Sequence, residues 1–190
     1  MKTVRMVLAG LVTLAAVSTA VHLTASDDRD RDRGRNITAR LVGANEVPVV
    51  STPASGRLKA EISRDGESID YELSFSGLGG VVAQSHIHIA QRNVNGGIVL
   101  WLCQGTSRAP AQVAALTPEC PQAGTVSGTL TAANVIPIAT QQIGPNEFSE
   151  AIAAIRAGNA YANVHTAPSP GGEIRGQLRV DDGDHGGKGK

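Results

Sequence analysis

AYANVHTAPSPGGEIRGQL, at residues 160–178, is the stretch that decides the fold of this chain. Its first part, residues 160–165, has the composition of a short strand and ends at His165. Its last part, residues 173–178, alternates polar residues with apolar or small ones. The prolines and glycines between the two parts favour a turn. The stretch therefore predicts a β-hairpin with His165 at the end of its first strand.

The same period of two recurs through much of the chain. Ile69, Tyr71 and Leu73 alternate with acidic and polar residues, as in a strand with one buried face. Glycine-rich turns separate such segments. The strands that we expect cover residues 37–42, 57–62, 69–75, 85–90, 98–103, 125–130, 160–165 and 173–180. These short strands predict a mainly β fold, an antiparallel sandwich or barrel of about eight strands.

One segment, residues 147–157, has the period of a helix instead. Its apolar positions recur at spacings of four and three residues, at Phe148, Ile152 and Ile155. Asn146 is the expected N-cap and Gly158 the expected residue after the last turn. We expect this short amphipathic helix to cover an open end or an edge of the sheet.

The N-terminus has the pattern of an export signal. Lys2 and Arg5 precede an apolar run, residues 6–17, and the small residues that follow predict cleavage after Ala20, with Ala25 as the alternative. The run is shorter than the roughly 20 residues of a membrane span, although a retained anchor is the other interpretation. We expect a secreted or periplasmic protein with no membrane span after cleavage.

The rest of the chain divides by composition. Residues 26–35 hold four aspartates, four arginines and no apolar residue, so residues 21–35 are expected to form a disordered linker. Residues 36–180 form the expected β domain, and residues 181–190 a disordered tail. Without the export signal the chain has 15 basic and 17 acidic residues, a balance that gives no reason to expect a nucleic-acid partner.

The two cysteines, Cys103 and Cys120, both lie in the exported part. An even number of cysteines in an oxidising compartment predicts one disulfide, which would contribute roughly 3 kcal/mol by closing its loop. Two thiols that bind a metal are the alternative interpretation.

Three histidines are candidate metal ligands. His86 and His88 lie two apart on an expected strand, so their side chains share a face, and His165 ends another strand. If those strands are neighbours, the three imidazoles converge into a site that suits copper or zinc, with copper favoured by intrinsic affinity. The alternative is a polar surface, hydrogen-bonded to Asn163 or Tyr161.

No set of residues predicts an enzyme. The chain has no Gly-x-Ser-x-Gly motif, and no second carboxylate is placed beside Glu173. Glu173 and Arg175 share a strand face, where we expect a surface ion pair. A His-x-His pair also occurs in the copper site of Cu/Zn superoxide dismutase, but this chain has no evident bridging histidine or zinc ligands, so redox chemistry remains only an alternative.

Several segments in order resemble the CHRD domain, named for its occurrence in chordin. They include Leu41-Val-Gly-Ala-Asn-Glu-Val-Pro48, His86-Ile-His88, Gly124-Thr-Val-Ser-Gly-Thr-Leu130 and the stretch from Tyr161 to Leu178. The resemblance covers residues 38–180 and implies an all-β extracytoplasmic domain. In chordin this domain belongs to a secreted growth-factor antagonist, but this chain lacks the cysteine-rich modules that accompany it there.

We therefore expect an exported, non-enzymatic binding module whose partner is an extracellular or envelope protein or glycan. One alternative is an extracytoplasmic copper or zinc protein with His86, His88 and His165 as ligands. The other is a structural envelope protein.

Overall fold

The computed structural model describes residues 34–181. The expected export signal, its cleavage site, most of the linker and most of the tail lie outside these residues. Among the described helices, none has the length and apolar character needed to cross a membrane.

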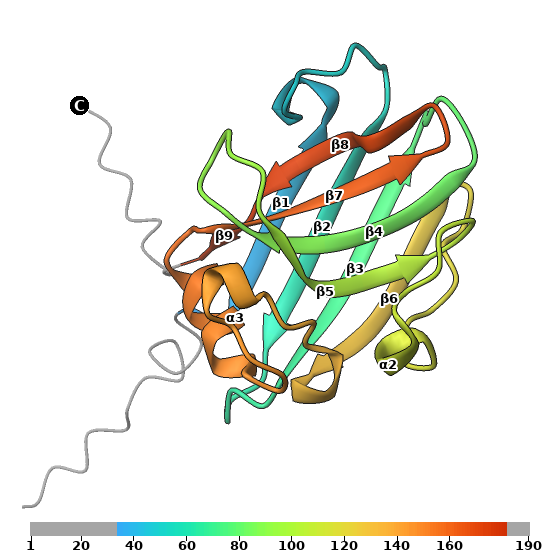
Figure 1. The fold of residues 1–190 in the computed structure, drawn as a ribbon. Coiled ribbons are helices and arrows are strands. Elements are labelled where there is room, and N and C mark those ends of the chain that lie inside the picture. The colour runs from blue at the N-terminus through green and yellow to red at the C-terminus, as the bar shows by residue number, and fades with distance from the viewer. Residues whose placement is uncertain (1–33, 182–190) are drawn as a thin grey trace, which may run out of the picture.

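The described chain forms one antiparallel sheet with two α-helices and three short 3-10 turns (Figure 1). Its strands are β1 (Asn36–Val42), β2 (Ser55–Ile62), β3 (Ser68–Ser76), β4 (Val82–Ile89), β5 (Gly97–Gln104), β6 (Gly124–Thr131), β7 (Ala160–Thr166), β8 (Ser169–Gln177) and β9 (Arg179–Val180). Its helices are α2 (Ala111–Ala114) and α3 (Phe148–Arg156), and its 3-10 turns are η1 (Gly43–Asn45), η2 (Ala132–Asn134) and η3 (Ala139–Gln141). The sequence predicted this mainly β class and the helix α3, but not α2.

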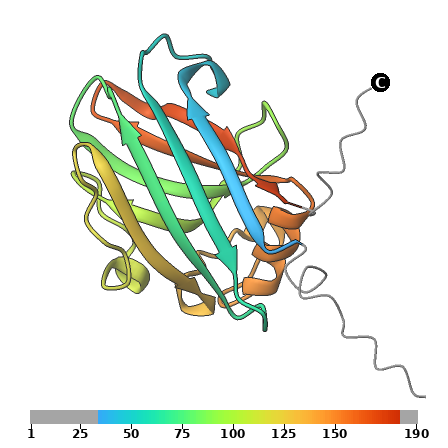
Figure 2. The same cartoon turned by 180° about the vertical axis from the view of Figure 1, so that it is seen from behind.

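The strands follow the order β5-β4-β7-β8-β1-β2-β3-β6, and β9 pairs with β1. The sheet curls into a nearly closed barrel, with β5, β4, β7 and β8 on one side and β1, β2, β3 and β6 on the other (Figures 1 and 2). The Tyr71 hydroxyl of β3 donates a hydrogen bond to the Leu102 carbonyl of β5 and so joins the two sides.

Alternation explains which side chains fill the barrel. Along β1 exposed and buried residues take turns, and Ile37, Ala39 and Leu41 point inward. Leu58 of β2 and Leu73 of β3 face each other in register and are fully buried. The core therefore consists mainly of aliphatic side chains, as a chain with 3% aromatic residues requires.

The expected single strand at residues 173–180 is wrong, because the chain changes partner within it. Leu178 still donates its N–H to the Ala160 carbonyl, but Arg179 and Val180 pair with β1. The pairing of β8 with β1 is confined to Val42 and Arg175. β8 and β9 are therefore separate strands that bridge the two sides of the barrel.

Helix α3 covers one end of the barrel, where Phe148, Ile152 and Ile155 are buried in the core (Figure 1). The expected Asn146 cap is wrong: Asn146 adopts a left-handed conformation with φ 63°, and the helix begins after Glu147. The Glu147 carboxylate accepts a hydrogen bond from the Gly144 N–H instead, at 2.6 Å. Gly158, at φ 72°, follows the last turn of the helix.

The structure places Cys103 of β5 and Cys120 at disulfide distance, with Cα atoms 5.0 Å apart. The loop that this pair closes contains α2, whose Val113 packs with Trp101 and Ala109 in a small second apolar cluster.

Candidate metal centre

The three candidate histidines lie on two neighbouring strands. β4 carries His86 and His88, β7 carries His165, and the two strands pair antiparallel so that His86 lies opposite Asn163. The side chains lie on the face of the sheet that points away from the core, because Ile87 between the first two is part of the core cluster. The sequence period therefore places all three imidazoles on the same face.

The three imidazoles converge. One nitrogen from each of His86, His88 and His165 can be chosen so that all three atoms lie within 4.8 Å of one another. A tetrahedral zinc ion with nitrogen ligands at about 2.0–2.1 Å holds them roughly 3.4 Å apart. The separation of up to 4.8 Å is wider than that, so the imidazoles would have to turn toward one another to bind one ion together.

The interpretation of these histidines as polar surface is wrong. Their exposed fractions are 1% for His86, 8% for His88 and 5% for His165. The edge of the Trp101 indole lies against His86, with ring centroids 4.7 Å apart, and Tyr161 stacks on His88 at 4.6 Å. Aromatic rings and backbone loops therefore shield a site that lies outside the core.

Backbone carbonyls fix the orientation of two rings. The Nδ1 of His88 is 2.9 Å from the Gly96 carbonyl oxygen, and the Nδ1 of His165 is 3.0 Å from that of Pro170. Since a carbonyl oxygen only accepts, each Nδ1 carries the proton and each Nε2 keeps its lone pair. Second partners of this kind set the tautomer of metal-binding histidines.

The lone pairs are only partly used. The Nδ1 of His86 is 3.1 Å from the Nε2 of His88, so the His86 N–H donates to that lone pair. The Nε2 atoms of His86 and His165 are buried without a hydrogen-bond partner. Two lone-pair nitrogens are thus left unsatisfied within one cluster, where most buried polar atoms are paired.

Burial keeps these imidazoles neutral. It lowers the pKa of His86 well below 6.5, and the neighbouring His165 and His88 lower it further. Burial likewise lowers the pKa of His88 to about 4 and moves that of His165 downward. At neutral pH the ring nitrogens therefore offer lone pairs rather than positive charge.

The buried carboxyl of Glu46 lies close to Asn163, the residue that pairs with His86 across the sheet. Glu46 and Asn163 both pack against Gly172, where there is no room for a side chain. A Cβ at this position would be 2.3 Å from Oε1 of Glu46 and 2.9 Å from Nδ2 of Asn163, which lies opposite His86. Burial raises the pKa of Glu46 to about 7, although Arg175 opposes the rise. The sequence analysis missed Glu46; its signal was one acidic residue within an otherwise uncharged segment, residues 41–48.

The expected pair of Glu173 with Arg175 is wrong. The Glu173 carboxylate accepts hydrogen bonds from the Thr52 hydroxyl at 2.7 Å, the Thr166 hydroxyl at 2.6 Å and the Gly79 N–H at 2.8 Å. Arg175 instead places its guanidinium 3.3 Å from the centroid of the Tyr161 ring. One residue therefore ties loops together, and the other supports the histidine cluster from behind Tyr161.

A family model, the CHRD domain, matches residues 37–178 of the chain. Comparison with curated proteins and with solved structures gave no match.

Proposed function

The chain belongs to the CHRD domain family, which suggests a binding or interaction module, and we propose that this module works outside the cytoplasm and holds one copper or zinc ion at His86, His88 and His165. The export pattern of the N-terminus and the Cys103–Cys120 pair support the location.

The observation that carries the metal proposal is the pair of unpartnered Nε2 atoms within a converging three-histidine cluster. A buried acceptor without a partner costs about 1–3 kcal/mol. A divalent ion would satisfy the lone pairs of His86 and His165, and the His88 lone pair would join them once the His86 N–H turns away. Copper is the preferred occupant because Cu(II) binds a given nitrogen site more tightly than Zn(II).

The burial of the site favours holding a metal over turning over a substrate. The most exposed of the three ligands, His88, has 8% of its surface accessible. A catalytic metal needs an open coordination position that a substrate can reach. These histidines therefore support the non-enzymatic expectation, with storage or structural stabilisation as the use of the metal.

Metal content and titration test the proposal. The protein is expressed with added copper or zinc, its metal content is measured by mass spectrometry, and Cu(II) and Zn(II) are titrated calorimetrically into the stripped protein. We expect about one ion per chain, absent in the His86→Ala/His88→Ala variant and retained in His185→Ala, the matched control from the expected tail.

Circular dichroism establishes that the double variant is folded, and a single His165→Ala variant replaces it if it is not. No saturable site tighter than about 10 μM in folded protein would overturn the metal proposal. Loss of binding in His185→Ala alone would overturn it as well. N-terminal sequencing of the exported protein tests the location separately, with Val21 expected as the first residue.

A further inference from the structure

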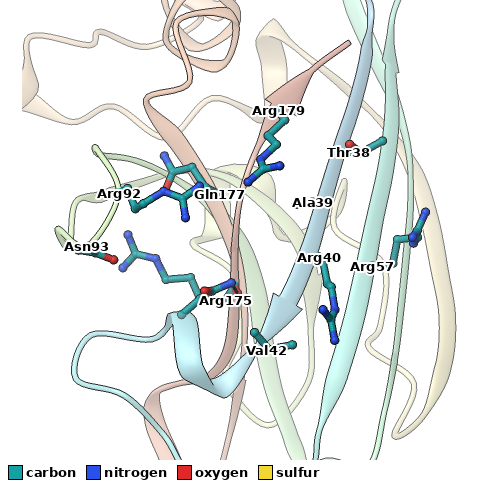
Figure 3. A pocket seen from close by; sticks show the side chains of 11 residues that line it. Thr38, Ala39, Arg40, Val42, Arg57, Arg92, Asn93, Arg175, Gln177 and Arg179 are labelled. Atoms are coloured by element: carbon teal, nitrogen blue, oxygen red, sulfur yellow. Dashed lines mark hydrogen bonds between the residues drawn. The ribbon is translucent and has the colours of Figure 1, made fainter. Parts of the chain in front are cut away.

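A second candidate site lies on the open outer face of the sheet. A hollow of about 420 Å³ sits over β1, β8 and β9 and the loop between β4 and β5 (Figure 3). Of the residues that the structure describes, no carboxylate lines it, but five arginines do: Arg40, Arg57, Arg92, Arg175 and Arg179. We call this surface the arginine groove. The whole chain has 17 basic and 17 acidic residues, so the excess of positive charge in the groove is local and does not reflect the overall composition.

Two of these arginines face each other, and within residues 34–181 neither forms an ion pair with a carboxylate. Arg40 of β1 and Arg57 of β2 are direct cross-strand partners and both are exposed. Like charges in this position destabilise a sheet. The charge of Lys59, two residues further along β2, is by contrast balanced by Glu72, its partner on β3. The Arg40–Arg57 pair therefore costs stability that an anionic ligand would restore.

In the described part of the chain, the other exposed arginines of the groove also have no acidic partner. Within residues 34–181, neither Arg92 nor Arg179 forms an ion pair or a hydrogen bond to a carboxylate, whereas Arg108 pairs with Glu119 elsewhere on the surface. Their guanidinium groups thus remain available, and a guanidinium binds carboxylate or sulfate through two parallel hydrogen bonds.

The wall of the groove is fixed in advance. Arg175, only 2% exposed, donates to the Val94 carbonyl at 2.7 Å and to Oδ1 of Asn95 at 2.9 Å. The Nδ2 of Asn95 donates in turn to the Val47 carbonyl. These bonds hold the loop that carries Arg92, so the ligand would not have to order it.

The groove continues into a second hollow across β2, β3 and β6. Arg40 and Arg57 line both hollows, and the second one adds hydroxyl-bearing side chains: Ser55, Ser74, Ser76 and Thr125. A row of charged donors followed by hydroxyls suits a polymer that carries both charge and hydroxyl groups. A single small anion would use only a part of this surface.

The position of the aromatic residues distinguishes between single-stranded nucleic acid and an acidic polysaccharide as the ligand. Single-stranded nucleic acid is bound by stacking its bases on aromatic side chains. All five aromatic residues of this chain are buried, with Tyr71 at 5% and Trp101 at 6% as the widest exposures. The groove therefore offers hydrogen bonds and charge but no stacking platform.

We propose that the arginine groove binds an acidic polysaccharide, whose carboxylate or sulfate groups lie between Arg40, Arg57 and Arg179 and whose hydroxyls contact the serines of the second hollow. This site is separate from the histidine cluster and does not depend on a metal there.

Binding is measured calorimetrically with polygalacturonate as the carboxylated probe, dextran sulfate as the sulfated probe and neutral dextran as the uncharged one. We expect saturable binding of at least one acidic polymer, weakened by added salt, and none of dextran. Preference between the two acidic polymers identifies the anion. Arg57→Gln and Arg40→Gln should each weaken binding by about tenfold, the equivalent of about 1.4 kcal/mol.

Arg64→Gln is the matched control, because Arg64 is exposed in the turn after β2, roughly 20 Å further along the hairpin. It should bind like the wild type. Equal losses in Arg64→Gln and Arg57→Gln would overturn the proposal, since they would indicate nonspecific attraction. Equal affinity for galacturonate monomer, or tighter binding of single-stranded DNA, would overturn it too.

The Arg57→Gln variant also separates a binding role from a structural one. If Arg57 serves the ligand, its replacement removes repulsion and the variant melts no lower than the wild type while binding falls. A lower melting temperature with unchanged polymer binding would assign Arg57 to the fold and overturn the proposal.

Discussion

The histidine cluster and the arginine groove lie on the same outer face of one sheet, yet they have opposite chemistry. Loops and aromatic rings cover the histidines, and burial keeps these side chains uncharged, with the Nε2 lone pairs of His86 and His165 unpartnered. The arginines on β1, β2 and β9 are exposed to water. The side chains themselves set which ion each region suits, and coverage by loops adds the burial that keeps the imidazoles neutral.

Arg175 belongs to both regions, so its removal should have the largest effect. Arg175→Ala would leave the Val94 carbonyl and Asn95 without their donor and uncover the Tyr161 ring. We expect the free energy of unfolding to fall by about 3 kcal/mol in urea denaturation, since hydrogen bonds from a charged group contribute roughly 1.5–3 kcal/mol. Arg179→Ala, at an exposed position, should change it by no more than about 0.5 kcal/mol. Similar small changes in both variants would contradict a structural link between the regions.

A bound metal should stabilise the protein through the histidine cluster and not through the arginine groove. Free Cu(II) at 100 times its dissociation constant should raise the free energy of unfolding by about 2.7 kcal/mol. The measurement is thermal denaturation of stripped protein with and without metal. The gain should vanish in His165→Ala and persist in Arg57→Gln. A gain that survives the histidine substitution would place the metal elsewhere.

Glu173 shows that burial does not always keep a side chain uncharged, as it does for the three histidines. This residue is only 2% exposed and still favours its ionised form. Burial by itself would raise its pKa, but hydrogen bonds from Thr166, Thr52 and Gly79 outweigh burial and hold it below 4.5. Glu173→Gln should cost about 2 kcal/mol at pH 7, since hydrogen bonds to a charged group contribute roughly 1.5–3 kcal/mol.

The pH dependence follows from the sign of that shift. A carboxyl whose pKa is lower in the folded state stabilises the protein above pH 4.5, and this contribution is lost as the pH falls through the folded value. Urea denaturation between pH 7 and pH 3 should therefore show a smaller loss of stability in Glu173→Gln than in the wild type. Parallel curves would contradict an ionised Glu173.

The smallest expected effect has the opposite sign. Arg57→Gln relieves the repulsion with Arg40 and should raise the free energy of unfolding by about 0.2–1 kcal/mol. The gain should shrink at high salt, where exposed charges are screened. Thermal melts at low and high salt measure it, and a decrease in stability at both would show that Arg57 is held by an unrecognised favourable contact.

Much of the histidine cluster could be predicted from the sequence, because its arrangement depends on the spacing of residues along single strands. A period of two places His86 and His88 on one face, and the hairpin of residues 160–178 places His165 at a strand end. The period of Phe148, Ile152 and Ile155 likewise predicts α3 to within one residue at each end. Local spacing is sufficient for such features.

The rest depends on which strands become neighbours. Arg40, Arg92 and Arg179 come together because β9 returns to β1 and the loop after β4 folds over β8. Glu46 approaches Asn163 only because Gly172 leaves space between them. The Asn146 cap failed for a local reason, since the Glu147 carboxylate takes the Gly144 N–H and the preceding residue turns left-handed.

The loop closed by Cys103 and Cys120 has a consequence for self-association. β5 is the last strand in the order of the sheet, and an unpaired strand edge invites pairing with another chain. Here Gln104 of β5 bonds through its backbone to Pro118 and Cys120, and the Val99 carbonyl accepts the Ile136 N–H. Reduction would release part of that cover, so we expect the reduced protein to aggregate through this edge more readily than the oxidised protein does.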